Sequence, residues 1–200
     1  PGWRQAMTQA LDVARRAATW GDVPIGAVIL GADGEVLSEA GNERERTGDP
    51  TAHAEVLAIR RAAEARDGWR LGDCTLVVTL EPCTMCAGTI VAARIPRVVF
   101  GAFDSKAGAV SSLFDVMRDP RLPHRPKVVT GVMAEESSAL LREFFDGHRA
   151  CTVDGDQHDD GTDTRKIRGD TTARGETGPV PAHSGNIQRH EFLASVTKVI

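Results

Sequence analysis

Apolar side chains recur at helical spacing in four stretches of the chain. In the first stretch, Met7, Leu11 and Ala14 lie on one side between charged residues, which predicts a helix over residues 3–20. Gly21 follows and predicts its end. The same spacing predicts helices over residues 54–65, 87–94 and 135–147. The first helix is expected to cover a surface of the core.

Continuous apolar runs predict strands between these helices. The clearest run is Cys-Thr-Leu-Val-Val-Thr-Leu at residues 74–80, which is typical of a central strand that is buried on both faces. Asp33-Gly34 predicts a hairpin turn between two earlier strands, and residues 41–50 are polar and predict a loop. The other predicted strands cover residues 25–30, 35–39, 97–101 and 127–132.

The order of these elements predicts an α/β fold with three layers. A mixed sheet of about five strands would carry helices on both faces, and ligands would bind where strands end and helices start. Residues 1–149 hold all of these elements and are predicted to form one domain. Residues 150–200 are predicted to be a low-complexity, poorly ordered tail, because residues 154–185 are rich in Asp, Gly, Thr and Pro and have almost no large apolar side chain.

Length and composition fit a single globular domain. The chain has 200 residues, of which 41% are apolar, enough for a sizeable core. It has no run of 18 apolar residues, and Pro1 to Arg4 opens into a helical pattern without a signal-peptide core, so a soluble, cytoplasmic protein is expected. The net charge of −4 argues against nonspecific duplex binding and leaves room for a local basic patch that docks a structured RNA.

Two short stretches carry candidate metal chemistry: Thr-Ala-His-Ala-Glu at residues 51–55 and Glu-Pro-Cys-Thr-Met-Cys at residues 81–86. They offer one imidazole, from His53, and two thiolates, from Cys83 and Cys86, a donor set that suits zinc better than magnesium or calcium. Three protein ligands leave the fourth position of zinc for water, as in catalytic sites. Zinc lowers the pKa of such a water from about 15.7 to about 7.

The positions of these residues support one shared site. Pro82 precedes Cys83, and proline is tolerated at a helix start but not inside a helix. Both cysteines are therefore predicted in the first turn of a helix, where unpaired backbone N–H groups favour thiolate. His53 and Glu55 stand at the start of the helix predicted over residues 54–65. Two helix starts would then meet at one metal, with Glu55 placed to accept a proton from the bound water.

Each stretch has other interpretations when taken alone. A Cys-x-x-Cys pair also occurs in redox proteins and in structural zinc sites, and a single His-x-Glu is weak evidence. The two stretches in this order, with proline before the first cysteine, match the pattern of zinc-dependent base deaminases. A zinc module without enzymatic activity would need a fourth protein ligand, for instance a repositioned Cys74. Otherwise Cys74 is expected to be a small buried apolar residue.

A third block, Val-Phe-Gly-Ala-Phe-Asp-Ser-Lys at residues 99–106, joins the first two. With these blocks the chain resembles the bacterial TadA-type tRNA adenosine deaminases, from about Trp3 to about Arg149. The resemblance implies the cytidine deaminase-like fold and a homodimeric hydrolase with one Zn²⁺ per chain. Its substrate would be a tRNA anticodon stem-loop, for which arginine tRNA is expected, and its reaction the conversion of the wobble adenosine to inosine by a zinc-bound hydroxide.

The resemblance also assigns roles to single residues. The metal ligands would be His53, Cys83 and Cys86, the proton shuttle Glu55, and the substrate-binding residues Asn42, Ala54, Asp104 and Lys106. Asn42 would hydrogen-bond the target base and is otherwise a turn former. Asp104 would touch the RNA and is otherwise an aspartate that caps its own loop. Phe103 stands where many relatives carry arginine and offers a stacking face for an unpaired base.

The sequence leaves open the class of substrate and the role of residues 90–95. A deaminase of free bases or nucleosides, of the guanine or cytosine type, would use the same zinc chemistry in a pocket closed by the C-terminus of its own chain. The run at residues 90–95 is either an exposed dimer contact or part of the core.

Overall fold

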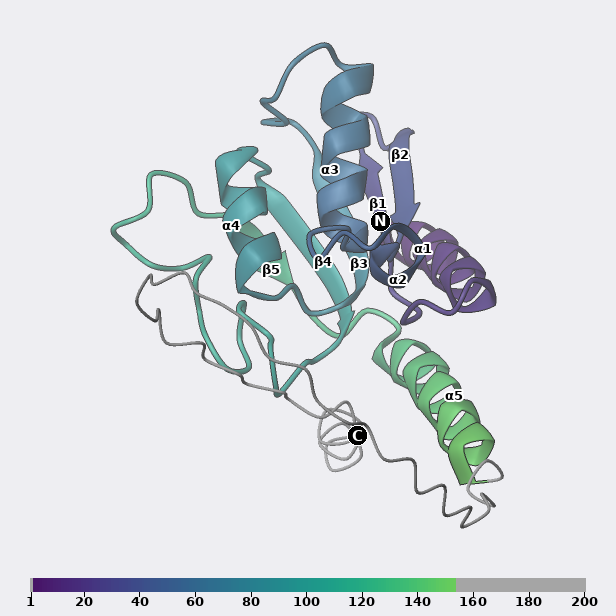
Figure 1. Ribbon diagram of the computed structural model, residues 1–200. Coiled ribbons are helices and arrows are strands. Elements are labelled where there is room, and N and C mark those ends of the chain that lie inside the picture. Colours follow the sequence, from purple (N-terminus) through teal and green to yellow (C-terminus); the bar gives the residue numbers. More distant parts are fainter. Residues whose placement is uncertain (1, 154–200) are drawn as a thin grey trace, which may run out of the picture. The chain divides into compact units, whose positions relative to one another are not determined.

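The computed structural model describes residues 2–153, which form a five-stranded sheet flanked by helices (Figure 1). The helices are α1 (Trp3–Thr19), α2 (Arg44–Thr47), α3 (Ala54–Ala65), α4 (Thr84–Ala92) and α5 (Ala134–Val153), and the strands are β1 (Gly26–Leu30), β2 (Val36–Gly41), β3 (Thr75–Leu80), β4 (Arg97–Ala102) and β5 (Lys127–Val129). Residues 154–200, which hold most of the predicted tail, lie outside the described residues.

The sheet is mixed, with the strand order β2-β1-β3-β4-β5. Strand β1 pairs antiparallel with β2 and β3, whereas β3, β4 and β5 run parallel. The pairs Val78–Phe100 and Leu80–Ala102 show that β3 and β4 reach the same edge with their carboxyl ends. Strand β1 begins at this edge too, because Ala27 pairs with Val78 near the end of β3. Strand β2 ends there, because its last residue, Gly41, pairs with Gly26. Four strand ends therefore meet there.

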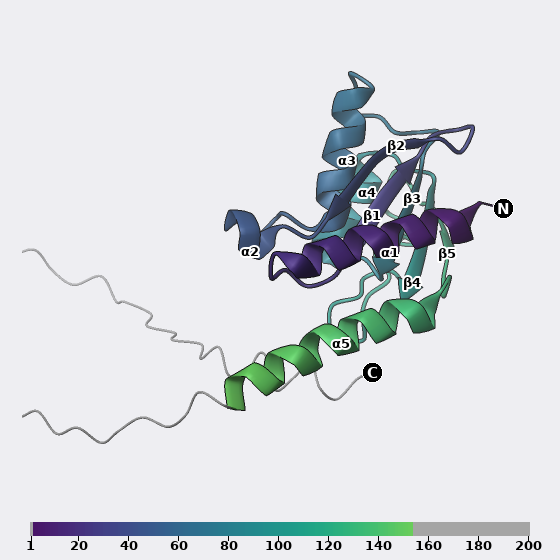
Figure 2. The same cartoon turned by 90° about the vertical axis from the view of Figure 1, so that its right-hand side faces the viewer.

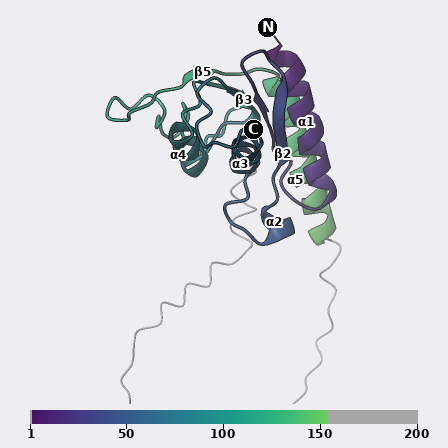
Figure 3. The ribbon, with the colours of Figure 1, turned by 90° about the horizontal axis from the view of Figure 1, so that it is seen from above.

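Helices cover both faces of the sheet, as predicted. Helices α1 and α5 lie on one face (Figures 2 and 3), where Met7 and Leu11 pack against Val77 and Val99 of the central strands. Helices α3 and α4 lie on the other face (Figure 3) and share a core with Leu76, the neighbour of Val77. Successive side chains of a strand point to opposite faces. Burial on both sides explains why β1 and β3 are continuous apolar runs.

A glycine lets α1 approach β1 closely. A Cβ atom at Gly26 would overlap the carbonyl oxygen of Ala10 and lie 2.7 Å from the backbone nitrogen of Ala14. Both obstacles are backbone atoms, which cannot rotate away. The amide of Gly26 in turn donates a hydrogen bond of 3.1 Å to the hydroxyl of Thr79 on β3. Helix α1 is thereby held against the strand ends that surround the metal-ligand residues.

One predicted loop contains a helix. The prediction of a loop over residues 41–50 is wrong for α2, a single turn that depends on a contact distant in sequence. Asp22 is fully buried, and its two carboxylate oxygens accept hydrogen bonds from the backbone amides of Glu45 and Arg46, at 2.9 and 3.1 Å. A carboxylate on the first amides of a helix caps it and complements its dipole.

Several predicted boundaries shift by a few residues. Helix α4 begins at Thr84, one residue after the start predicted at Cys83, because Cys83 has an extended backbone and is its N-cap. Strand β5 is shorter than predicted, since Gly131 has a positive φ of 76° and turns the chain. Helix α5 continues past Gly147, and the Nδ1 atom of His148 is 2.8 Å from the carbonyl oxygen of Phe144.

Candidate metal centre

The three predicted zinc ligands lie at the N-termini of two helices. His53 is the N-cap of α3 and Cys83 the N-cap of α4, each with an extended backbone. Cys86 is in the first turn of α4. Neither N-cap side chain makes a capping hydrogen bond to its own helix, so both remain available to a ligand. The first-turn prediction is confirmed for Cys86, whereas Cys83 stands one residue before the helix.

The distances within this cluster fit a zinc ion. The Nδ1 atom of His53 lies 3.7 Å from the Sγ of Cys83 and 3.5 Å from the Sγ of Cys86. All three ligand atoms lie within 4.8 Å of one another. Tetrahedral zinc with Zn–S of about 2.3 Å and Zn–N of about 2.0 Å places nitrogen and sulfur about 3.6 Å apart. The two nitrogen–sulfur distances therefore match those of a zinc site.

The electrostatics of the two cysteines also favour metal binding. The hydrogen bond with the Cys86 thiol is the largest cause that lowers the pKa of Cys83 to about 4; burial opposes it, and a hydrogen bond with His53 adds to it. The same Cys83–Cys86 bond and burial raise the pKa of Cys86. One thiolate and one thiol thus share a proton when no cation is bound. Zinc binding replaces that proton, because the ligand form of cysteine is the thiolate.

Glu55 is a buried carboxylate beside this cluster. It lies in the first turn of α3, is 4% exposed, and its Oε2 atom has no hydrogen-bond partner among the described residues. Burial raises the pKa of Glu55 to about 7. A nearby dication would oppose this rise. A carboxylate that is poised near neutral pH can both take up and release a proton.

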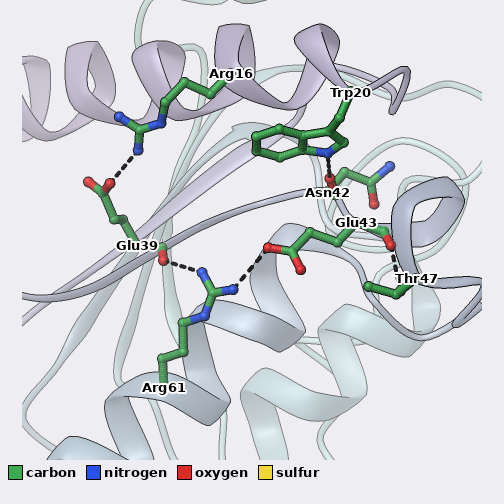
Figure 4. A network of polar contacts seen from close by, with 7 residues as sticks. All are labelled: Arg16, Trp20, Glu39, Asn42, Glu43, Thr47 and Arg61. Atoms are coloured by element: carbon green, nitrogen blue, oxygen red, sulfur yellow. Dashed lines mark hydrogen bonds and ion pairs between the residues drawn. The ribbon is translucent and has the colours of Figure 1, made fainter.

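Asn42 provides a second buried oxygen without a partner. It follows β2 directly, is 3% exposed, and its Oδ1 atom has no hydrogen-bond partner among residues 2–153. Its backbone is fixed on both sides. The backbone N–H of Asn42 donates a hydrogen bond of 3.0 Å to the carbonyl of Ile25. The backbone carbonyl of Asn42 accepts a hydrogen bond of 3.1 Å from the indole of Trp20 (Figure 4). A buried acceptor held this firmly is suited to bind a ligand donor.

Glu43, the residue after Asn42, is held by Arg61 of helix α3. Arg61 donates to the carbonyl of Glu39 at 2.8 Å and to the carboxylate of Glu43 at 2.9 Å (Figure 4). The carboxylate of Glu39 also pairs with Arg16 of α1, and Thr47 donates to the carbonyl of Glu43. The end of β2 and the segment after it are therefore tied to α1, α2 and α3. The sequence prediction did not include Trp20 or Arg61, because isolated aromatic and basic residues on helices give no specific signal.

The remaining predicted substrate residues have different environments. Ala54 is fully buried between His53 and Glu55, whereas Lys106 is exposed. The Oδ1 atom of Asp104 accepts hydrogen bonds from the backbone amides of Lys106 and Ala107, at 3.0 and 3.1 Å. Asp104 therefore caps its own loop, which was its alternative interpretation. Its predicted contact with RNA remains a prediction.

Cys74 does not provide a fourth ligand. Among the described residues, His53, Cys83 and Cys86 are the only group of three or more such side chains close enough to hold a metal ion. Cys74 is fully buried just before β3, at the opposite end of that strand, and its Sγ lies 3.5 Å from the Oδ1 of Asp73. Burial raises the pKa of Cys74 to about 11. Its prediction as a small buried apolar residue is confirmed.

Three ligands beside a buried carboxylate with one oxygen that has no partner among the described residues, at the edge of a mixed sheet, define the class of zinc-dependent base deaminases. Comparison with known families agrees. The model of the cytidine and deoxycytidylate deaminase zinc-binding region matches residues 3–102, and the chain belongs to this family, as a member of its tRNA-specific adenosine deaminase branch. The predicted resemblance is confirmed.

Individual relatives show how far the similarity extends. The tRNA-specific adenosine deaminase of Bacillus subtilis (strain 168) is 45% identical over 139 residues, which cover 70% of this chain and 86% of that protein. A solved structure from a study of A-to-I editing by tRNA:A34 deaminases is also 45% identical, with a TM-score of 0.66, and the match covers 68% of this chain and 98% of that one. A guanine deaminase from Nitrosomonas europaea is 26% identical with a TM-score of 0.59, over 70% of this chain and 83% of that one.

None of the helices described in residues 2–153 is both long enough and apolar enough to cross a membrane.

Proposed function

We propose that this chain deaminates the wobble adenosine of a tRNA anticodon, with water as the second substrate and inosine and ammonia as products. One observation carries the proposal. A zinc-ligand cluster with the unpartnered Oε2 of Glu55 beside it occurs in a chain that is 45% identical to tRNA-specific adenosine deaminases over most of their length.

The zinc ion would be held by His53, Cys83 and Cys86. Its charge would lower the pKa of a water molecule, so that a weak base can remove a proton at neutral pH. Glu55 does the proton transfer. Its Oε2 atom takes one proton from water as the oxygen adds to C6 of adenine and passes it to N1. It then takes the second proton from the new C6 hydroxyl and gives it to the departing amine. Burial raises the pKa of Glu55, which favours this return. Ammonia leaves, and the oxygen stays on the base.

Asn42 and Ala54 shape the base pocket in this proposal. The Oδ1 atom of Asn42 accepts a hydrogen bond from the base and thereby gains the partner that it lacks. A buried acceptor without a partner costs about 1–3 kcal/mol, so a base that supplies a donor is favoured. Ala54 is fully buried between His53 and Glu55, and its small side chain leaves room for a flat ring.

The segment after β4 is proposed to contact the RNA. Phe103 is 55% exposed, with its ring edge-to-face against Phe100 at 5.2 Å between centroids, so its outer face is free to stack on an unpaired base. Lys106 would meet a phosphate, and Asp104 the nucleotide beside the target. An anticodon loop is single-stranded, so moving one base into the pocket costs only a few kcal/mol. Arginine tRNA is the proposed substrate.

The test is inosine formation by the zinc-loaded protein. An arginine-tRNA anticodon stem-loop with adenosine at the wobble position is compared with free adenosine, cytosine and guanine. We expect inosine in the stem-loop and no ammonia from the free compounds. Ammonia from a free base alone would show that the zinc chemistry is right and the tRNA assignment is wrong.

Guanine is the second candidate substrate, because the guanine deaminase of Nitrosomonas europaea has a similar fold at 26% identity. The same assay distinguishes the two. Deamination of guanine at a rate above that of the stem-loop would favour this candidate.

We propose further that the catalytic domain is residues 1–149, that the enzyme acts in the cytoplasm where tRNA is used, and that it is a homodimer.

The predicted dimer contact at residues 90–95 is not exposed, because Ile90 and Ile95 are fully buried. Leu113 and Phe114, 52% and 53% exposed, are better candidates for the dimer contact. Light scattering on the wild type and on a Leu113→Glu, Phe114→Glu variant tests this, and a monomeric wild type would refute it.

A further inference from the structure

Glu81 is a buried carboxylate that no step of the proposed reaction uses. It stands between the end of β3 and Pro82, and it is 2% exposed. A buried ionised group is costly unless it is paired or hydrogen-bonded. The sequence shows Glu81 only as part of the zinc-binding stretch. Its contacts explain its burial.

Glu81 binds a single segment of the chain, residues 104–112, with both carboxylate oxygens. Oε1 accepts hydrogen bonds from the backbone amides of Val110, Ser111 and Ser112, at 3.1, 2.7 and 2.9 Å. Oε2 accepts one of 3.1 Å from the amide of Asp104 and another from the hydroxyl of Ser112. One carboxylate therefore satisfies four backbone amides at the two ends of this segment. Three successive amides around one oxygen form a nest for an anion.

The same segment lies against a zinc ligand. Gly108 and Cys83 form an isolated antiparallel bridge, and the amide of Ala109 donates a hydrogen bond of 2.8 Å to the carbonyl of Pro82. The approach depends on glycine, because a Cβ atom at Gly108 would lie 2.5 Å from the carboxyl carbon of Glu81. Glu81 thus holds the segment at the place where it touches the metal-binding stretch.

We propose that Glu81 is a positioning residue that fixes residues 104–112 as one wall of the substrate site. The segment carries Asp104 and Lys106, which the proposed function places on the RNA, so this inference rests on that function. Glu81 acts through the segment, because its own oxygens are occupied by protein donors. If the segment loosens, substrate contacts weaken, while His53, Cys86 and Glu55 keep their places on α3 and α4.

The chain offers a graded pair of variants and a matched control. Glu81→Gln keeps the shape of the side chain but removes the charge and turns an amide NH₂ toward backbone N–H groups. Ser112→Ala removes one hydroxyl and leaves the four backbone hydrogen bonds. Ser38→Ala is the control, because Ser38 is also buried and donates a hydrogen bond of 2.7 Å to the carbonyl of Ala58, between β2 and α3.

Four quantities are measured on each zinc-loaded protein: zinc content, KM on the stem-loop, kcat on the stem-loop, and hydrogen exchange of the backbone amides of Asp104, Val110, Ser111 and Ser112. For Glu81→Gln we expect one zinc per chain and KM raised about tenfold or more, because a displaced substrate-positioning segment weakens binding. We also expect kcat to change by less than about threefold and exchange at these amides to be faster by at least about tenfold. Ser112→Ala should shift KM and exchange in the same direction by less. Ser38→Ala should lower the midpoint of thermal unfolding and leave KM unchanged.

The proposal would be overturned if Glu81→Gln left hydrogen exchange at the four amides unchanged. It would also be overturned if the variant lowered kcat and left KM unchanged. If Glu81→Gln does not fold, Ser112→Ala decides in the same way. A wild type that does not deaminate the stem-loop would refute the proposed function. The exchange result would then still show whether Glu81 fixes the segment.

Discussion

His53 and Cys83 cap the N-termini of two different helices, and the Nδ1 of one lies 3.7 Å from the Sγ of the other. They are thirty positions apart in the chain. The pairing of β1 with both β2 and β3, which puts the ends of β2 and β3 on one edge of the sheet, and the packing of α3 and α4 on one face bring them together. The metal centre therefore joins two helices, and losing the metal should affect both.

Zinc should stabilise the folded protein through this centre. A ligand that binds only the folded state raises stability by about 2.7 kcal/mol at one hundred times its Kd, so adding zinc to chelator-treated protein should raise the midpoint of thermal unfolding by several degrees. Cys86→Ser should lose most of this rise. The measurement is calorimetry with and without zinc. Cys74→Ser is the control, because Cys74 lies outside the cluster, and it should keep the full zinc effect.

Glu55→Gln should separate metal binding from turnover. Glu55 is not among the three clustered ligands, so one zinc per chain is expected, while kcat falls by about 10² to 10⁴ with the loss of proton transfer. The variant should be at least as stable as the wild type without zinc, because the neutral amide removes the cost of a buried charge. Zinc analysis, kinetics and thermal unfolding measure the three effects. Turnover at the wild-type rate would show that Glu55 is not the proton shuttle.

Trp20→Phe should weaken base binding through Asn42. The change removes the indole donor to the Asn42 carbonyl and costs about 1 kcal/mol, the usual net value of such a bond. KM on the stem-loop should rise by about fivefold while kcat changes little. The matched control is Trp69→Phe, because Trp69 is 56% exposed, and it should leave KM at the wild-type value. Equal KM values for both variants would contradict the role given to Trp20.

Gly26→Ala should destabilise the fold strongly. Its Cβ atom would overlap the backbone of Ala10 and crowd that of Ala14, and overpacking of this kind costs about 1–3 kcal/mol or more. Gly72→Ala is the control, since no atom lies within 4 Å of a Cβ there, and its stability should change by less than about 0.5 kcal/mol. Urea unfolding of both variants measures the difference. Similar midpoints would show that α1 can move away from β1 without cost.

The sequence alone determined the chemistry of the metal centre. His53, Cys83 and Cys86 stand in two short stretches with chemical patterns that few other functions share, so local residue types were enough to predict the ligands. The buried strands were predictable for a similar reason, because β1 and β3 are runs without a charged residue in which apolar side chains predominate. Amphipathic spacing likewise predicted α1 and α3 almost to the residue.

Only the tertiary structure decided which other residues serve this centre. Asp22 forms α2 by reaching amides more than twenty residues away, and no local pattern encodes such a contact. The alternative of Cys74 as a fourth ligand was excluded only by the direction of β3, which puts Cys74 and Cys83 at opposite ends of one strand. Glu81 looked like a polar residue beside a proline, and its role became visible only when residues 104–112 folded over it. Ligand chemistry is set by residue type, whereas burial and hydrogen-bond partners are set by which distant segments the fold brings together.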